Sequence, residues 1–438
     1  MQIALKNVGY IKEAKVGLTG LNVVAGPNGT GKSTIGKTIY TIIKSISDCD
    51  NIAYEHRKTL IHSLRRSIFH SMRNDLEVIV MRKRSLFEEP DDMEKLMSHF
   101  GRSFEESLTK FLKNNEYEQA RELINHNIAL VDSFSGLKNK SKSTAKKLLN
   151  DLLNEFTTVD RNDKIEQSLR FMYQKMFRQQ VNSLNSHEIA EVFLDNNGNN
   201  LKYHISNNVE TLPFSDRLVI DDIGDDLEQC IFLDATFIET PLILQVADNI
   251  GLPFHWNDIT TKLTDNSVNN TESNICNQVY KELSCILGGE LVYIDDKQDF
   301  FFVHKGTDNK LYVSNMASGE KMLGILQKMA KLGLLLPEHL LILDEPENHL
   351  HPEWQIRLAK ILITLVDNSI PILLTTHSAT LIDALQEFAE AKGISDKARF
   401  YFADQKKRTI KDVKHIKNKG KDIIFESFYN AKKFLPDR

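Results

Sequence analysis

The segment Gly26–Ser33 constrains this chain more than any other, because its glycines and its lysine are spaced as in a phosphate-binding loop. It reads Gly-Pro-Asn-Gly-Thr-Gly-Lys-Ser and matches the pattern GxxxxGK[ST]. A short apolar run, Leu21–Ala25, precedes it, and a helical pattern follows from about residue 32 to 45. In such a loop, backbone N–H groups turn toward phosphate oxygens, and the helix N-terminus adds its positive dipole end. The order strand, loop, helix predicts an α/β fold that binds a nucleotide.

The residues of this loop have separate predicted roles. Lys32 is expected to reach the β- and γ-phosphates of ATP, and the Ser33 hydroxyl to bind Mg²⁺. Thr34 is a further phosphate contact; an ordinary Gly-rich turn is the alternative interpretation. The predicted ATP-binding residues are Pro27, Asn28, Gly29, Thr30, Gly31, Lys32, Ser33 and Thr34.

Two acidic residues end the apolar run Leu340–Leu343. Asp344 is expected to hold the Mg²⁺ shell together with Ser33, and Glu345 to orient and deprotonate the attacking water. An acidic pair at a strand end is common by itself, so the phosphate-binding loop upstream is what favours this interpretation.

A third apolar run, from residue 371, ends in Thr375-Thr376-His377-Ser378. We expect its strand to lie parallel to the two strands above, so that all three present their carboxyl ends to one crevice. His377 would then lie near the γ-phosphate and report whether that phosphate is present. A purely structural histidine is the alternative.

The stretch Ala317–Lys321 opens a predicted helix from about residue 319 to 334. Ser318 is a good N-cap residue, and Gly319 leaves the first N–H groups of the helix open. Ser318, Gly319 and Glu320 are therefore expected to form a second anion site, which faces a phosphate other than the one that Lys32 holds. A plain helix cap is the alternative.

Composition excludes several classes of protein. Hydrophobic residues make up 41% and charged residues 26% of the 438 residues, so a wholly disordered chain is excluded. Lys plus Arg number 55 and Asp plus Glu 60, so no overall basic charge attracts nucleic acid. The four cysteines form no CxxC pair, and the N-terminus shows no signal-peptide pattern. We expect a cytoplasmic protein that does not cross a membrane.

The order of these motifs resembles that of ABC-class ATPases, in the branch of the structural-maintenance-of-chromosomes (SMC) and double-strand-break-repair ATPases. It is most similar to the overcoming-lysogenisation-defect (OLD) type. The motifs that carry the resemblance are GPNGTGKST (26–34), ASGEK (317–321), LILDEPENHLHPEWQ (341–355) and TTHS (375–378).

The resemblance implies an α/β P-loop NTPase fold, an ABC-type ATPase head with an inserted helical lobe. The predicted parts are an ATPase core at residues 1–46 and 280–404, a helical lobe at 47–187, a mixed strand and helix part at 188–279 that completes the head, and a basic C-terminal segment at 405–438.

The resemblance also implies how such a site is completed. The Ser318–Glu320 signature of one chain would face the ATP that Lys32 of a second chain holds, so that ATP and Mg²⁺ close a head-to-tail homodimer, or a higher assembly of dimers. Glu345 and His377 would be the catalytic pair. The signature differs from the Leu-Ser-Gly-Gly-Gln of transporters, which argues against a membrane transporter.

Stand-alone ATPases of this pattern resemble the ATPase subunits of bacterial anti-phage systems, which control a separate nuclease or toxin effector. The alternative is a DNA-binding SMC-like clamp, which would use the basic segments Arg57–Arg84 and Lys406–Lys421. A small-molecule kinase is a third option.

Three further residue assignments stay open. Gln245 is one guess for a glutamine that completes the Mg²⁺ shell, and Tyr10 is a candidate for stacking on adenine. His349 and His351 invite a metal site, although Pro352 and the family loop explain them better.

Overall fold

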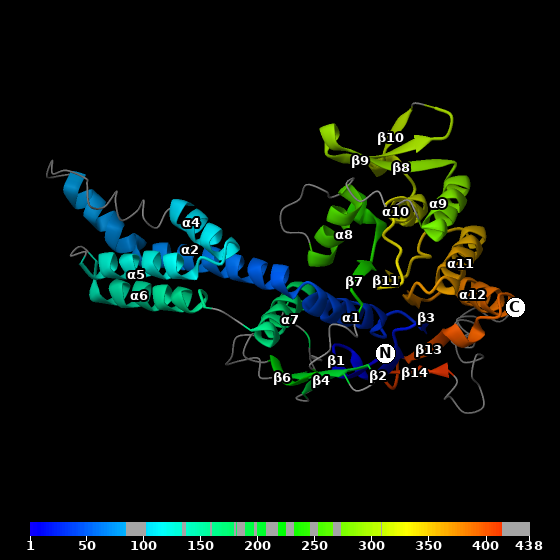
Figure 1. Cartoon of the computed structure of the whole chain (residues 1–438), viewed down its shortest axis with the longest axis horizontal. Coiled ribbons are helices and arrows are strands. Elements are labelled where there is room, and N and C mark those ends of the chain that lie inside the picture. Colours follow the sequence, from blue (N-terminus) through cyan, green and yellow to red (C-terminus); the bar gives the residue numbers. More distant parts are fainter. Residues whose placement is uncertain are drawn as a thin grey trace, which may run out of the picture. The chain divides into compact units, whose positions relative to one another are not determined.

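The chain divides into two units, which are described separately (Figure 1). The head comprises Met1–Ser47 and Met172–Arg438, and the helical unit comprises Asp48–Phe171. The computed structural model describes residues 1–84, 102–133, 137–157, 160–178, 181, 189–196, 199–206, 218–224, 232–245, 253–265, 273–307 and 309–413.

A mixed sheet of eleven strands runs through the head. One part of it is antiparallel and includes the N-terminal hairpin of β1 and β2; the other part is parallel. The strand order is β6 (Leu218–Ile223), β5 (Asn199–Ile205), β4 (Ala190–Asn196), β1 (Gln2–Val8), β2 (Ile11–Gly17), β14 (Thr409–Asp412), β13 (Ala398–Asp404), β3 (Leu21–Ala25), β12 (Ile372–Thr376), β11 (His339–Asp344) and β7 (Asp234–Ile238).

The parallel part brings the predicted motifs to one edge. Strand β12 lies between β3 and β11, with Thr376 opposite Ala25 and Thr375 opposite Asp344. Strand β7 continues the sheet beyond β11, with Ile238 opposite Leu343. The predicted parallel arrangement of the three motif strands is confirmed, and the predicted α/β P-loop fold with it.

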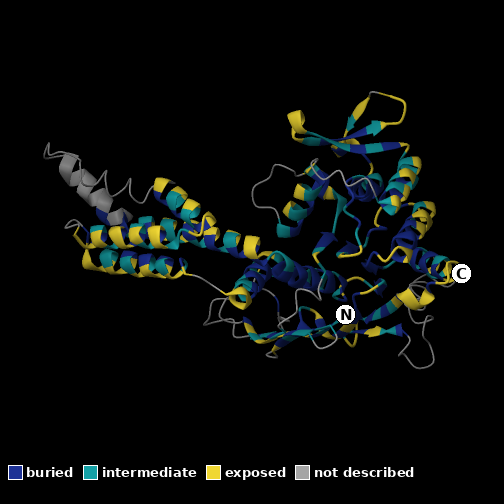
Figure 2. Cartoon of the chain, in the orientation of Figure 1, coloured by how far each residue is buried: buried dark blue, intermediate teal, exposed yellow. Residues whose placement is uncertain are grey.

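Both faces of these parallel strands are covered, which explains why β3 and β12 are buried along their whole length and mostly apolar. Helix α1 (Lys32–Ser47) covers one face and approaches closely at Gly36, where an added Cβ would lie 3.1 Å from Phe237 and 3.2 Å from Ile342. The apolar core on the other face comes from α10 (Ser318–Lys331), α11 (Pro352–Asp367) and α12 (Ala379–Ala391). Figure 2 shows α1 and the central strands as buried.

A smaller sheet completes the head. It has the order β10 (Lys310–Tyr312), β9 (Asp299–His304) and β8 (Gly289–Ile294) and packs with α9 (Asn274–Leu287) and α10, while α8 (Phe254–Thr264) packs against β7 and α10. The buried Gln327 of α10 joins these pieces, because its amide accepts the N–H of Leu291 and donates to Gly289 O and Ser284 Oγ.

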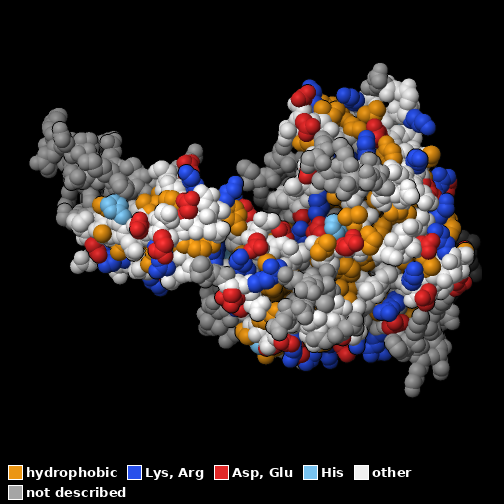
Figure 3. Space-filling view, viewed as in Figure 1, with side chains coloured by type: hydrophobic (Ala, Val, Ile, Leu, Met, Phe, Trp, Pro, Cys, Tyr) orange, Lys and Arg blue, Asp and Glu red, His pale blue; other side chains and the backbone are white. Residues whose placement is uncertain are grey.

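The helical unit consists of α2 (Cys49–Arg84), α4 (Arg102–Lys113), α5 (Tyr117–Ser133), α6 (Asn139–Asn154) and the first part of α7 (Arg161–Phe177). Apolar residues at three- and four-residue spacing form its core, among them Ile61, Leu149 and Leu152. On the face in Figure 3, acidic and basic side chains are interspersed over its surface. None of the helices described is both long and apolar enough to span a bilayer.

Candidate functional site

The predicted phosphate-binding loop lies between β3 and α1 and lines a cavity of 490 Å³. Its glycines are required by the backbone: Gly29 and Gly31 have φ of 74° and 90°, a region that residues with a side chain rarely adopt. At Gly31 an added Cβ would also lie 2.7 Å from Cγ1 of Ile11. The residues that line the cavity are Tyr10, Asn28, Gly29, Thr30, Gly31, Lys32, Ser33, Thr34 and Glu345.

Lys32 is buried at the base of this loop. Its Nζ donates to Gly26 O at 2.9 Å and to Pro27 O at 3.0 Å, and it forms an ion pair with Glu345 Oε1 at 3.2 Å. The lysine therefore already contacts the carboxylate predicted to act as the base.

Asp344 ends β11 at the same edge and is buried. Burial raises the pKa of its carboxyl, and the charges of Glu239 and Glu345 raise it further, while hydrogen bonds from Thr375 and Ser33 lower it. This crowding of carboxylates is what a bound cation relieves. The Asp344 carboxylate and the Ser33 hydroxyl are hard oxygen ligands of the kind that Mg²⁺ prefers, so this pair fits the ion.

Glu345 follows in a strained backbone conformation, with a φ of 50°. Its N–H donates to O and Oγ1 of Thr375, which ties it to β12. Burial raises the pKa of its carboxyl, but the charge and hydrogen bond of Lys32, together with Asn348 and His377, outweigh burial, so the pKa is lowered. The carboxyl group is thus kept ionised, as a base must be.

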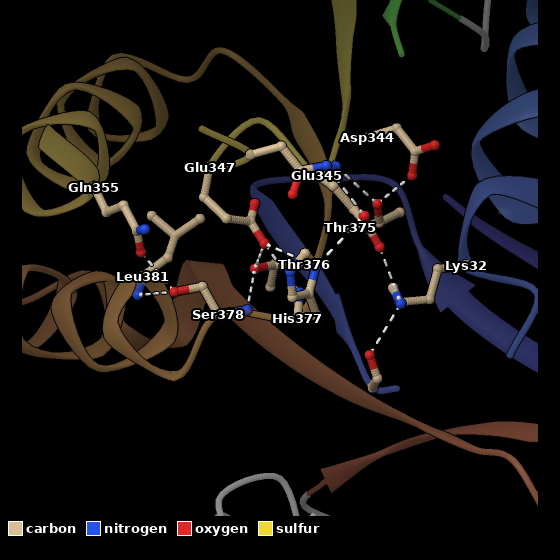
Figure 4. Close-up of polar contacts among 12 residues, drawn as sticks. Lys32, Asp344, Glu345, Glu347, Gln355, Thr375, Thr376, His377, Ser378 and Leu381 are labelled. Atoms are coloured by element: carbon tan, nitrogen blue, oxygen red, sulfur yellow. Dashed lines mark hydrogen bonds and ion pairs between the residues drawn. The ribbon is translucent and has the colours of Figure 1, made fainter. Parts of the chain in front are cut away.

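His377 follows β12 and faces two carboxylates (Figure 4). Its Nδ1 lies 3.4 Å from Glu345 Oε2 and 3.6 Å from Glu347 Oε1. The predicted base and the predicted switch histidine are therefore neighbours, although they are far apart in the sequence.

Glu347 is a buried member of this cluster to which the sequence assigned no role. Its Oε1 accepts the Oγ1–H of Thr376 at 2.5 Å and the backbone N–H of His377 at 3.0 Å. Burial raises the pKa of its carboxyl. The only sequence signal was its place in the motif that carries the family resemblance, because nothing near it in the chain reveals its partners.

The Ser318–Glu320 segment lies apart from the cavity just described, whose lining does not include it. It starts α10, but the predicted N-cap is wrong: Ala317 is the N-cap and Ser318 is the first helical residue. Ala317 has no side-chain acceptor, and the stabilising contact instead runs from its N–H to Glu320 Oε2 at 3.2 Å. Gly319 is closely packed, since an added Cβ would lie 2.8 Å from His349 O.

Glu239, directly after β7, is a second residue that sequence reasoning missed. It forms an ion pair with Lys37 at 2.7 Å and contacts His255 Nε2 at 3.0 Å. Burial raises its pKa, but these two partners dominate and lower it to about 2. Its charge is one of those that raise the pKa of Asp344.

Gln245, the residue guessed from the sequence to complete the Mg²⁺ shell, is exposed at the end of the 3-10 helix η2 (Pro241–Gln245) and does not line the cavity.

Tyr10 lines the cavity and is held by the β13–β14 turn. Its hydroxyl donates to Gln405 O at 3.2 Å, its carbonyl accepts Nε–H of Arg408 at 2.8 Å, and the Arg408 guanidinium lies 4.9 Å from its ring centre. The ring is 41% exposed, which leaves it accessible to a planar ligand. Stacking on adenine stays a prediction.

The predicted basic segments are only partly accessible. Arg57 is buried, Lys58 pairs with Glu55, and Arg65 pairs with Glu105. Of the C-terminal segment Lys406–Lys421, residues beyond 413 lie outside the described part of the chain. Within that part, no group of three or more His, Cys, Asp and Glu side chains is arranged to hold a metal ion, and this covers His349 and His351.

These residues can together perform one kind of chemistry. The loop can bind a triphosphate, Asp344 and Ser33 can hold its cation, and Glu345 can activate a water molecule. His377 borders the same position and can respond to the terminal phosphate.

Comparisons with known proteins agree with this chemistry. A family model described as AAA ATPase domain matches residues 1–382. Among curated protein sequences, none matches the chain.

Similar solved structures include three SMC heads. The first is an SMC head bound to the C-terminal winged-helix domain of ScpA. It is 11% identical, the match covers 94% of this chain and 95% of that chain, and the TM-score is 0.40. The second is the SMC head domain from Thermotoga maritima, at 13% identity, 92% and 93% coverage and a TM-score of 0.34. The third is an SMC head with an extended coiled coil, bound to the C-terminal domain of ScpA and derived from Pyrococcus furiosus, at 11% identity, 94% coverage of each chain and a TM-score of 0.32.

Proposed function

The chain belongs to the AAA ATPase domain family, and on that premise we propose that it hydrolyses ATP at a head-to-tail homodimer interface. The observation that carries the proposal is the contact of Lys32, Glu345 and His377 at the ends of three adjacent parallel strands. Each residue has a distinct task, and the tasks together make one reaction.

In the resting site, Lys32 and Glu345 neutralise each other. Binding of ATP draws the Lys32 ammonium to the β- and γ-phosphates, which releases the Glu345 carboxylate. The released carboxylate takes a proton from the attacking water. Before that step the carboxyl group is ionised, because its surroundings lower its pKa. Ser33 and Asp344 would hold Mg²⁺, which supplies positive charge to the phosphates.

The dimer is proposed because the Ser318–Glu320 segment is separate from the cavity that Lys32 lines. The backbone N–H groups at the start of α10 can bind an anion, and a second copy of the chain offers a triphosphate. ATP then joins two copies, and hydrolysis by Glu345 separates them.

The test measures mass by light scattering with and without ATP and Mg²⁺. We expect Glu345→Gln to accumulate as an ATP-dependent dimer, and Glu345→Gln with Ser318→Arg to stay monomeric with ATP bound. The control is Glu345→Gln with Ser395→Arg, an exposed position in the 3-10 helix η5 (Ser395–Lys397), which should still dimerise. A dimer that persists in the Ser318 variant would refute the head-to-tail interface.

For the biological role, we infer a regulatory ATPase of a bacterial anti-phage system, with a separate nuclease or toxin effector. This inference rests on the resemblance of the stretch from Glu347 to Pro352, together with Gln355, to OLD-type ATPases. Gln355 has a defined place, since it accepts Ser378 Oγ–H at 2.6 Å and donates to Leu350 O at 3.0 Å. Co-purification with the product of a neighbouring gene, and loss of phage resistance in Lys32→Ala, would support it; phage resistance unaffected by Lys32→Ala would refute it.

The second candidate is a DNA clamp, which one observation favours. A groove of 580 Å³ between α2 and α6 exposes cationic and hydroxyl side chains that suit phosphates. The groove is lined by Arg65, Arg66, Ser67, Phe69, His70, Ser71, Thr144 and Leu148. ATP-dependent, salt-sensitive binding of duplex DNA that Arg66→Glu abolishes would favour this function over the first.

A further inference from the structure

Two carboxyl groups from one loop flank the same atom, Nδ1 of His377, and their surroundings differ. The Glu345 side chain is 23% exposed and is shared with Lys32 and Asn348. The Glu347 side chain is 2% exposed, and Lys32 does not contact it. One of the two carboxyl groups is therefore partly exposed and paired with the lysine of the phosphate-binding loop, and the other is buried against the end of β12 (Figure 4).

The contacts of Glu347 show what fixes it. Its Oε1 accepts from both Thr376 Oγ1 and the backbone N–H of His377. Thr376 Oγ1 also accepts the N–H of Ser378 at 3.0 Å. The carboxyl group thus binds the end of β12 at Thr376 and at the backbone of His377, while its Oε2 is buried without a hydrogen-bond partner. A buried oxygen without a partner costs stability, so a structural role alone does not account for a carboxyl here.

We propose that Glu347 is a positioning residue, which keeps the His377 imidazole directed at the γ-phosphate while Glu345 acts on water. This deepens the proposed function and rests on it. When Lys32 and Glu345 turn to ATP and water, the imidazole loses one carboxyl neighbour and keeps the buried one. Glu347 Oε1 accepts the backbone N–H of His377 at 3.0 Å and lies 3.6 Å from its Nδ1, so the carboxylate fixes the backbone that carries the imidazole and places a negative charge beside Nδ1.

The experiment compares Glu347→Gln with a matched control, Glu353→Gln. Glutamine keeps an oxygen that can accept from Thr376 and His377 but removes the negative charge beside Nδ1. We expect kcat for ATP hydrolysis to fall by about tenfold, with KM within about twofold of wild type. Glu353 is exposed on α11 and pairs with Arg357, so its variant should hydrolyse ATP at the wild-type rate.

A double-mutant cycle with His377→Ala separates positioning from general damage. If Glu347 acts through the imidazole, Glu347→Gln lowers kcat no further in the His377→Ala background. Multiplied losses in the double variant, or a wild-type kcat in Glu347→Gln alone, would overturn the proposal. If Glu347→Gln fails to fold, Thr376→Val replaces it in the cycle, because Thr376→Val removes the hydroxyl that donates to Glu347 Oε1. Multiplied losses with His377→Ala, or a wild-type kcat in Thr376→Val alone, would then overturn the proposal.

Glu345→Gln, measured in parallel, distinguishes this inference from the proposed function. Wild-type hydrolysis by Glu345→Gln would refute the assigned base and, with it, the proposal built on it. An inactive Glu345→Gln beside a fully active Glu347→Gln would refute the positioning role only.

Discussion

The head and the helical unit bury different kinds of side chain. In the described part of the head, buried charged residues are Lys32, Lys44, Lys321, Lys328, Asp344 and Glu347. In the described part of the helical unit they are Arg57 and Asp75, and the core is otherwise mostly apolar. The head therefore carries a larger desolvation cost, which its ion pairs and hydrogen bonds offset.

The position of the charged side chains differs between the two units and indicates which unit holds the functional site. Charges in the helical unit form exposed pairs between helices or one helical turn apart, such as Lys146 with Asp132 and Lys58 with Glu55. Charges in the head meet at strand ends, where the backbone of Glu345 is also strained. The buried carboxyl groups Asp344 and Glu347 of the head lie together at one edge of the sheet, whereas the buried Asp75 of the helical unit is paired with Lys138, and such clustering of charge is typical of a functional site.

The largest effect is expected from Lys32→Ala in the head. It removes the ammonium that contacts the loop carbonyls and Glu345 and would bind the phosphates, so kcat/KM for ATP should fall on the order of 10³-fold. Calorimetric titration with ATP measures the affinity, and a hydrolysis assay measures kcat/KM. Lys6→Ala, at an exposed pair with Glu191, should leave both unchanged; ATP binding by Lys32→Ala at wild-type affinity would contradict the assigned site.

Lys44→Ala tests the buried ion pairs of the head. Its Nζ lies 2.9 Å from Asp234 and 3.1 Å from Asp258, and its loss leaves these two half-buried carboxylates with Lys262 and, for Asp258, the Tyr40 hydroxyl. We expect the free energy of unfolding to fall by about 3 kcal/mol, which denaturant titration measures. A loss below about 1 kcal/mol would show that this buried lysine contributes no more than an exposed ion pair does.

Leu149→Ala tests the apolar core of the helical unit. Leu149 is fully buried, so the cavity should cost about 2–5 kcal/mol in unfolding of this unit. The intrinsic ATPase rate of the head should not change. A parallel loss of ATP affinity would mean that the helical core supports the nucleotide site, against the contrast drawn above.

Acid should destabilise the head through Glu239. The pKa of its carboxyl group is about 2 in the folded protein and 4.5 in the unfolded chain. The ionised carboxylate therefore stabilises the fold fully above about pH 4.5, and this stabilisation is lost as the pH falls toward 2. The shift corresponds to at most about 3 kcal/mol. Unfolding measured across this range should depend less on pH in Glu239→Gln; an unchanged pH dependence would contradict the ion pair with Lys37.

Lys146→Ala should have the smallest effect. Its pair with Asp132 lies in the helical unit with both side chains more than a third exposed. We expect a loss of about 0.2–1 kcal/mol, decreasing with added salt. Since the substitution is the same as Lys44→Ala, the two unfolding curves compare exposed and buried lysine directly.

Local patterns in the sequence predicted much of the fold and the site. The phosphate-binding loop and the three parallel strands that carry the motifs each show their signal within a few consecutive residues. The predicted N-cap at Ser318 failed because a cap is set by backbone dihedral angles, and a favourable side chain alone does not choose between neighbouring residues.

Interactions between distant residues were not predictable in this way. Glu347 meets Thr376 and His377 across 29 and 30 residues of sequence, and Glu239 affects Asp344 from a separate strand. No pattern in the residues around Glu347 or Glu239 encodes these contacts, because the order of strands in a sheet differs from their order in the chain.

The sequence by itself determined that this chain has a glycine-rich loop between a buried strand and a helix, and two carboxylates at the end of a second strand, because backbone freedom at glycine and charge at a strand end are local properties. Only the tertiary structure decided that Glu347 and Glu239 join them, since burial and the pairing of charges depend on which surfaces pack together. The same reason leaves the Ser318–Glu320 segment outside the cavity of its own chain.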